Sequence, residues 1–171
     1  HQLEDKTFQA GLKTLGDMGL SFDAWLYHPQ IPDLTAAARA VPGTRMVLDH
    51  VGGPLAIQGY AGKRDEVFKT WAASIKELAT CPNVFIKLGG LGMRINGFGF
   101  EDQPDPPGSE VLAKAWKPYI ETCIEAFGAQ RCMFESNFPV DMITSSYAVL
   151  WNAFKRLAVG ASEAEKAALF A

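Results

Sequence analysis

The feature that most constrains the fold is a repeated pairing of a short apolar segment with a longer stretch of helical periodicity. The apolar segments are residues 20–27 (LSFDAWLY), 45–49 (RMVLD), 84–88 (VFIKL) and 131–134 (RCMF). Short apolar runs are typical of β-strands that are covered on both faces. Four strand–helix units in succession predict a parallel sheet with right-handed crossover connections, and therefore the α/β fold class.

Apolar residues at helical spacing mark the predicted helices between and around these strands. The helices are expected at about residues 8–18, with Gly19 as the C-terminal cap, and at 32–41, 67–78, 111–127 and 147–157. Pro118 predicts a kink or a restart in the fourth of them. Ser162 and Glu165 have the spacing of a capping box, which predicts a last helix that the sequence cuts off at Ala171.

The length of the chain bears on the kind of α/β fold. A complete (β/α)8 TIM barrel takes about 250 residues, and this sequence has 171. Four β-α units in this length favour a fragment of such a barrel, with residues 1–171 forming half of one domain. A small open sheet is the alternative.

Composition excludes several classes of partner. The net charge is −3 and there is no basic run, so nucleic acid is not expected to bind. No apolar stretch approaches the roughly 20 residues that cross a bilayer, so no membrane association is expected. The three cysteines are far apart and odd in number, which favours buried free thiols in a reducing compartment, and hence a cytoplasmic location.

In both architectures the functional site is expected at the carboxyl ends of the strands. The candidate residues lie inside or after the strands: His28 after the first, His50 after the second, Lys87 and Arg94 with the third, and Glu135, Asn137 and Asp141 after the fourth.

The sequence favours a functional role more strongly for His50 than for His28. An imidazole can bind metal, carry a proton or donate a hydrogen bond to a substrate oxygen. His50 is favoured for such a role because Gly52 and Gly53 beside it let a ligand approach the backbone, although it could instead cap the glycine turn. For His28, beside Pro29, substrate binding and simple packing stay equally open.

The basic candidates predict an anionic small-molecule substrate. Lys87 stands among apolar strand residues, so it either faces inward with an anionic partner or points outward. Arg94, in a glycine-rich loop, could bind a substrate carboxylate through its planar fork or be a solvated surface residue.

The carboxylates after the fourth strand are candidates for a general base or a metal ligand. We expect Asp141 to lie at the rim, where it meets water and substrate, although it could merely cap a helix. Glu135, deeper in the strand, is expected to hold Lys87.

Several motifs together resemble a known family. Leu48-Asp49-His50-Val51-Gly52-Gly53-Pro54 is similar to the sixth strand and loop of the amidohydrolase-2 group of metal-dependent barrel hydrolases. The segments 27–30 (YHPQ), 85–91 (FIKLGGL) and 131–140 (RCMFESNFPV) resemble the fifth, seventh and eighth strands. The resemblance implies a TIM barrel, of which this chain would carry strands five to eight.

The same resemblance implies a function: water, activated by a metal or by a carboxylate, attacks a lactone or related ester carbonyl. His50 matches a histidine that binds metal or polarises substrate, and Arg94 lies near where lactonase relatives hold a substrate carboxylate. One divalent metal such as zinc is implied, but a metal-independent reaction stays open. So does self-association into a homo-oligomer.

One departure from the family pattern matters for the chemistry. The usual eighth-strand aspartate is Asn137 here, and a neutral amide cannot take a proton at pH 7. Either Glu135 or Asp141 replaces it as base, or Asn137 only orients water or substrate. A decarboxylase or other lyase on the same barrel, and a binding protein with a decayed site, are the alternatives.

Overall fold

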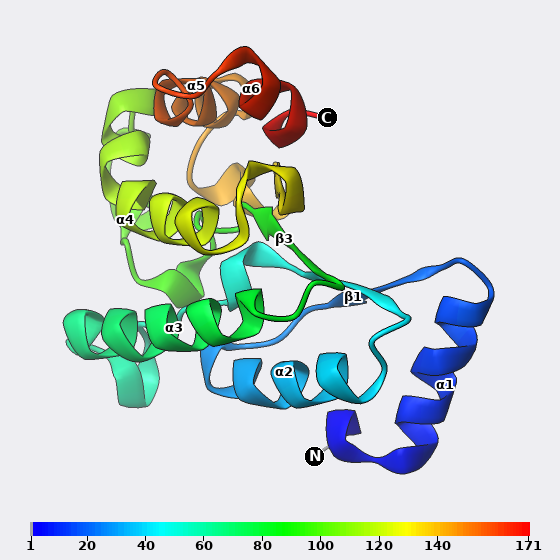
Figure 1. The fold of residues 1–171 in the computed structure, drawn as a ribbon. Helices are drawn as coiled ribbons and strands as arrows, with labels where there is room; N and C mark the ends of the chain where they lie inside the picture. The colour runs from blue at the N-terminus through cyan, green and yellow to red at the C-terminus, as the bar shows by residue number, and fades with distance from the viewer. Residues whose placement is uncertain (1) are drawn as a thin grey trace.

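The computed structural model describes residues 2–171, and His1 lies outside the described part (Figure 1). Four parallel strands form one sheet in the order β1-β2-β3-β4, which confirms the predicted α/β class. The strands are β1 (Ser21–Ala24), β2 (Arg45–Leu48), β3 (Val84–Leu88) and β4 (Cys132–Phe134). Because all four run the same way, their carboxyl ends meet at one edge of the sheet.

Residues 2–171 form six α-helices, and α2, α3 and α4 lie together along one side of the sheet in Figure 1. The helices are α1 (Lys6–Asp17), α2 (Ile31–Ala40), α3 (Arg64–Ala79), α4 (Ser109–Phe127), α5 (Tyr147–Leu157) and α6 (Glu163–Leu169). The capping box of Ser162 and Glu165 begins α6 as predicted. Gly19 follows α1 with a φ of 72°, which suits the predicted C-terminal cap.

The sheet has one covered face and one partly open face. In β3, Val84, Ile86 and Leu88 are fully buried, whereas the alternate residues Phe85 and Lys87 are partly exposed. Side chains alternate between the faces of a strand, so the buried set faces the helices and the other set faces away from them. The expectation that both faces are covered therefore holds for only one face within the described residues.

Three boundaries differ from the sequence-based prediction. Strand β1 ends at Ala24, not at residue 27, because its neighbour β2 ends opposite it at Leu48. Helix α4 runs through Pro118 without restarting, since buried residues on both sides of the proline hold it against the core. Helix α6 ends at Leu169 instead of being cut off at Ala171.

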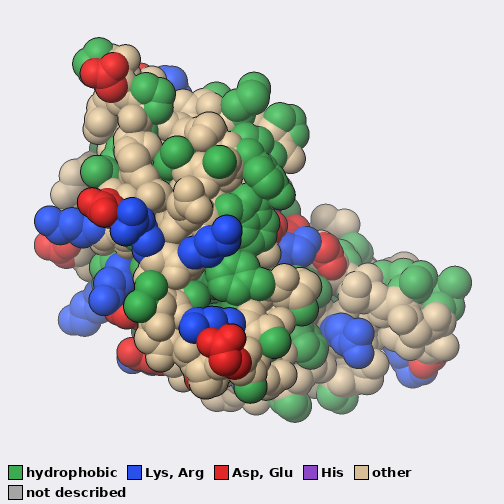
Figure 2. Space-filling view, turned by 90° about the horizontal axis from the view of Figure 1, so that it is seen from above, with side chains coloured by type: hydrophobic (Ala, Val, Ile, Leu, Met, Phe, Trp, Pro, Cys, Tyr) green, Lys and Arg blue, Asp and Glu red, His purple; other side chains and the backbone are tan. Residues whose placement is uncertain are grey.

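The edges of the sheet are flanked by exposed apolar side chains. These are Leu20, Trp25 and Tyr27 around β1, and Val140, Met142, Ile143 and Tyr147 in the segment after β4. Figure 2 shows hydrophobic side chains gathered in a band along one face of the molecule.

The cysteine side chains lie as their number and spacing predict. Cys81, Cys123 and Cys132 are all buried and free, as predicted. Among the described residues, no helix is both long and apolar enough to cross a membrane.

Candidate active site

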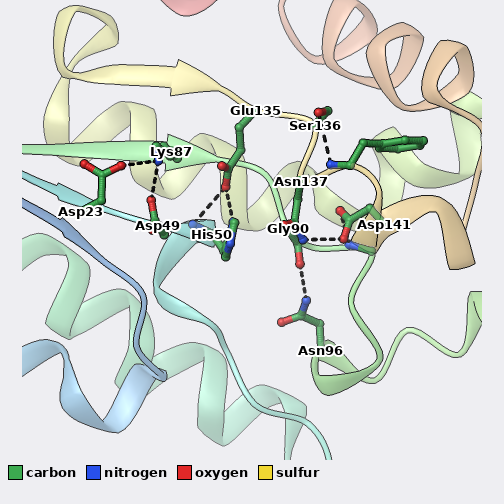
Figure 3. Close-up of polar contacts among 12 residues, drawn as sticks. Asp23, Asp49, His50, Lys87, Gly90, Asn96, Glu135, Ser136, Asn137 and Asp141 are labelled. Atoms are coloured by element: carbon green, nitrogen blue, oxygen red, sulfur yellow. Dashed lines mark hydrogen bonds and ion pairs between the residues drawn. The ribbon is translucent and has the colours of Figure 1, made fainter.

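A histidine–glutamate pair joins the ends of β2 and β4. His50 follows β2 in a short 3₁₀ turn (His50–Gly52), and Glu135 directly follows β4. One carboxylate oxygen of Glu135 accepts hydrogen bonds from the His50 backbone N–H, at 3.1 Å, and from the His50 ring at Nδ1 (Figure 3). Both side chains are mostly buried. The pair therefore fixes the imidazole and leaves Nε2 as its reactive nitrogen.

The backbone is strained at three residues of this edge. His50, Val51 and Asn137 have positive φ, at 54°, 48° and 51°. A residue other than glycine rarely adopts this left-handed region, and such residues cluster at functional sites. These residues follow β2 and β4 at the same edge of the sheet, which supports a functional role for this edge.

Glycines after β3 give the site its close packing. An ideal Cβ on Gly90 would lie 2.6 Å from the Cβ of His50, and one on Gly92 would lie 2.9 Å from the Asp141 carboxyl carbon. A Cβ on Gly89 would collide with Glu135. Each glycine thus makes room for one candidate residue, and any side chain there would displace it.

Lys87 lies on the face of the sheet that points away from the helices, which is the inner face in a barrel. Its partners there are not the expected one. Its ammonium lies 2.6 Å from Asp23 Oδ2 and 2.8 Å from Asp49 Oδ1 (Figure 3). The prediction that Glu135 holds Lys87 is wrong, because Asp23 and Asp49 from the two preceding strand units reach it instead. Burial lowers the pKa of Lys87, but its hydrogen bonds to Asp23 and Asp49 outweigh burial and raise it. Lys87 is therefore a fixed cation.

Asp141 is buried beneath the rim and does not lie on it. Only 1% of the residue is exposed. Its Oδ1 accepts from the Asn137 side-chain amide at 2.8 Å, and its Oδ2 accepts from the Gly92 backbone at 3.2 Å. Burial raises the pKa of Asp141 to about 6, although both hydrogen bonds oppose the rise. The carboxylate therefore ties the loop after β3 to the loop after β4.

The contact to Asp141 also sets the direction of the Asn137 amide. One N–H of its NH₂ group is donated to Asp141, and its carbonyl oxygen is free to accept a hydrogen bond from water or substrate. That oxygen can accept a hydrogen bond but cannot remove a proton.

Arg94 and His28 lie apart from the His50–Glu135 pair. Arg94, two-thirds exposed, contacts Glu101 at 3.4 Å and Asp102 at 3.6 Å in its own loop. His28 is buried, with Nδ1 accepting from the Leu55 N–H at 3.2 Å and its ring edge-on to Tyr60. Burial lowers the pKa of His28, which favours the neutral ring.

The two histidines are connected through the backbone of one glycine. Gly53 donates to the His50 carbonyl at 3.0 Å and accepts from the His28 N–H at 3.2 Å. The bond to Glu135 brings His50 next to the segment after β4, at the sheet edge where both residues were expected. Its connection to His28 runs through Gly53.

Three residues at this edge were not singled out from the sequence. Asp23 and Asp49 hold Lys87, and Trp25 packs its ring against His50 with centroids 4.6 Å apart. Asp49 could have been found, since it directly precedes His50 in the matched motif. Asp23 and Trp25 lie within or beside an ordinary strand pattern, which carries no signal for a site.

The described residues do not form a metal centre by themselves. In residues 2–171, no three His, Cys, Asp or Glu side chains lie together so that they could hold a metal ion. Nδ1 of His50 is engaged by Glu135, so this histidine offers a metal only Nε2. A complete set of ligands would need residues from outside this part of the chain.

Comparison with known proteins identifies the family. A family model described as amidohydrolase matches residues 1–171, and the chain belongs to that family. Protein y4mH of Sinorhizobium fredii is 38% identical over 163 residues, covering 95% of this chain and 48% of the relative. L-fucono-1,5-lactonase of Burkholderia multivorans is 28% identical over 177 residues, covering 98% and 54%. The chain spans about half the length of these curated relatives.

A solved structure supports the same assignment. An amidohydrolase from Burkholderia multivorans, crystallised with bound zinc, matches with a TM-score of 0.83 and 27% identity, covering 99% of this chain and 60% of that one. The four-stranded sheet is thus a fragment of an amidohydrolase TIM barrel, as expected from the resemblance.

Proposed function

We propose that this chain is the C-terminal half of a single amidohydrolase barrel domain that hydrolyses a lactone or related cyclic ester with activated water. The observation that carries the proposal is the His50–Glu135 pair at the carboxyl ends of β2 and β4. Family membership and the two lactonase relatives support the reaction class. The coverage of about half of each relative supports the half-barrel assignment.

The pair has the arrangement of a general base and its orienting carboxylate. Glu135 holds Nδ1, so Nε2 of a neutral His50 takes a proton from water as the water oxygen bonds to the ester carbonyl carbon. The resulting tetrahedral intermediate collapses and breaks the ring C–O bond. The proton on Nε2 passes to the leaving alkoxide, and the product is a hydroxy acid. Glu135 stabilises the imidazolium that forms between these steps.

Asn137 and Asp141 assist this reaction without removing a proton. The Asn137 carbonyl oxygen is free to orient the attacking water, because Asp141 holds the other end of the amide. Asp141 touches neither water nor substrate in this scheme. It is a positioning residue that keeps Asn137 and the glycine loop in place.

The substrate is a small molecule, and an anionic group on it would be met by Arg94. Lys87 is not available for that role, because Asp23 and Asp49 both pair with its ammonium. Arg94 would have to leave Glu101 and Asp102, and those contacts of 3.4 and 3.6 Å are loose enough to exchange. His28 supports the site through Gly53 without direct contact to substrate.

A divalent metal such as zinc belongs to the proposal only for the complete barrel. The zinc-bound amidohydrolase structure supports it. His50 Nε2 would be its ligand from this half only in place of the base role, because one lone pair cannot both bind a metal and take a proton from water. No step above depends on the metal.

The test uses the full-length protein and a panel of sugar lactones and pyrone dicarboxylates. Acid release is followed with a pH indicator, carbon dioxide is measured in parallel, and bound metal is determined by elemental analysis. We expect acid release from at least one lactone and its loss in Glu135→Gln. Carbon dioxide release would instead favour a lyase. Ligand binding without turnover would favour a binding protein with a decayed site.

A further inference from the structure

A large aromatic side chain stands exposed in direct contact with the proposed general base. Trp25 follows β1 and is 45% exposed, although tryptophan is usually well buried. Its ring meets the His50 ring edge to face, with centroids 4.6 Å apart and planes at 70°. Tyr27, also exposed, meets the indole in the same manner at 5.6 Å and 73°.

The indole is held firmly in spite of its exposure. An ideal Cβ on Gly53 would lie 3.3 Å from the outer carbons of the six-membered ring, so the glycine backbone packs against the edge of the indole. His50, Tyr27 and Gly53 thus all contact the ring. A rigid and exposed aromatic surface is prepared to bind a ligand because little side-chain freedom remains to be lost.

The carboxylates near the indole are engaged by another side chain. The neighbouring carboxylates of Asp23 and Asp49 are both paired with Lys87. What the indole and Tyr27 offer is therefore apolar area, with the imidazole beside it. The C–H face of a saturated ring fits such a surface and, unlike an open chain, loses no internal rotations on binding.

We propose that Trp25 and Tyr27 form an aromatic wall that binds the ring of a cyclic ester next to His50. The inference rests on the proposed function and specifies its substrate class: a saturated, ring-shaped lactone in preference to an open-chain ester. Trp25 is the specificity-determining residue, and Tyr27 supports its orientation.

The kinetic test compares Trp25→Ala and Trp25→Phe in the full-length protein. The substrates are a sugar 1,5-lactone and the open-chain methyl ester of the same acid. We expect Trp25→Ala to raise KM for the lactone about 10-fold while kcat changes less than about 3-fold, as loss of one aromatic contact implies. Trp25→Phe should recover most of the loss, and KM for the open ester should not change. Met18→Ala, at an exposed apolar residue after α1, is the control.

A binding measurement separates this inference from the proposed reaction. In the Glu135→Gln background, the lactone should shield one tryptophan from acrylamide quenching, and Trp25→Phe should abolish that shielding. Binding and shielding without hydrolysis in the wild type would overturn the proposed function and leave the aromatic wall standing. Hydrolysis with an unchanged KM in Trp25→Ala would contradict the binding role of the aromatic wall and leave the proposed reaction standing. If the rest of the barrel already shielded the Trp25 indole from acrylamide in the absence of lactone, that result would also contradict the aromatic wall.

Discussion

At the scale of the residue, the site depends on which side chain holds which. Glu135 is engaged by His50 twice, through the backbone and through the ring, while Lys87 has its own two carboxylates. Asp141 has both oxygens occupied and is buried. Of the two carboxylates considered as base, the structure therefore leaves Glu135 in contact with the reactive group and Asp141 in a supporting position.

The first prediction concerns Glu135→Gln in the full-length protein. The neutral amide keeps the shape but no longer stabilises the imidazolium, so kcat for lactone hydrolysis should fall by about 10²-fold or more with little change in KM. Glu121→Gln, at an exposed residue of α4, is the matched control and should leave kcat unchanged. If kcat stayed unaffected in Glu135→Gln and fell strongly in Asp141→Asn, the result would contradict the His50–Glu135 pair and favour Asp141 as the base.

The second prediction follows from the raised pKa of Asp141. A carboxyl group whose pKa rises from 3.8 to about 6 on folding binds its proton more tightly in the native state. Its contribution to stability is complete below pH 3.8 and is lost as pH rises through about 6. Relative to Asp141→Asn, which does not titrate, the wild type should therefore gain unfolding free energy as pH falls from about 6 to 4. Urea unfolding at several pH values measures this difference, and parallel curves for the two proteins would contradict it.

At the scale of the element, the glycine-rich segment after β3 joins the other loops of the site. Its glycines lie against Glu135, His50 and Asp141, and Thr144 from the segment after β4 donates to the Gly92 carbonyl at 2.6 Å. Asn96, farther along the same loop, donates to the Gly90 carbonyl at 2.8 Å and is itself buried. This loop therefore positions side chains that belong to the neighbouring strands.

The third prediction compares Gly90→Ala with Gly99→Ala. Both glycines have a φ of 67°, so each alanine pays a similar cost of about 1–2 kcal/mol for the left-handed backbone. Only at Gly90 would the new Cβ meet the imidazole; at Gly99 nothing lies within 4 Å. We expect both variants to lower the melting temperature, Gly90→Ala more because its Cβ also collides with His50, and only Gly90→Ala to cause a large loss of kcat. Equal kcat values in the two variants would show that the glycine loop does not position His50.

At the scale of the whole molecule, the described sheet has two ends that no further strand pairs with. Strands β1 and β4 each have a single neighbour, and exposed apolar side chains lie around both. Unpaired edges and uncovered inner side chains favour association with another chain or segment. The remaining strands of a barrel would pair with both edges.

The fourth prediction is that residues 1–171 expressed alone do not behave as a stable enzyme. We expect aggregation, dimerisation, or rescue by a separately expressed N-terminal half of the barrel. Light scattering after size exclusion gives the mass, and circular dichroism gives the melting behaviour, with the full-length protein as reference. A monomer that melts in one cooperative transition and hydrolyses lactones would refute the half-barrel interpretation.

The sequence by itself determined the parts of this protein that depend on short-range pattern. The four strands, the helices between them, the capping box of α6 and the cap at Gly19 follow from periodicity and local conformational preference. Parallel connections then require the strand ends to share an edge, so His50 and Glu135 were both expected there. Their motifs also pointed to the amidohydrolase family.

Only the tertiary structure decided which partners these residues take. Lys87 pairs with Asp23 and Asp49 and not with Glu135, because strand register and the depth of each side chain choose among several carboxylates at one edge. Asp141 is buried instead of lying at the rim, because the loop from β3 folds over it. Pro118 stays inside α4, since packing outweighs one missing hydrogen bond. The contact of the exposed Trp25 with His50 likewise joins segments that are distant in the chain, and no local pattern encodes it.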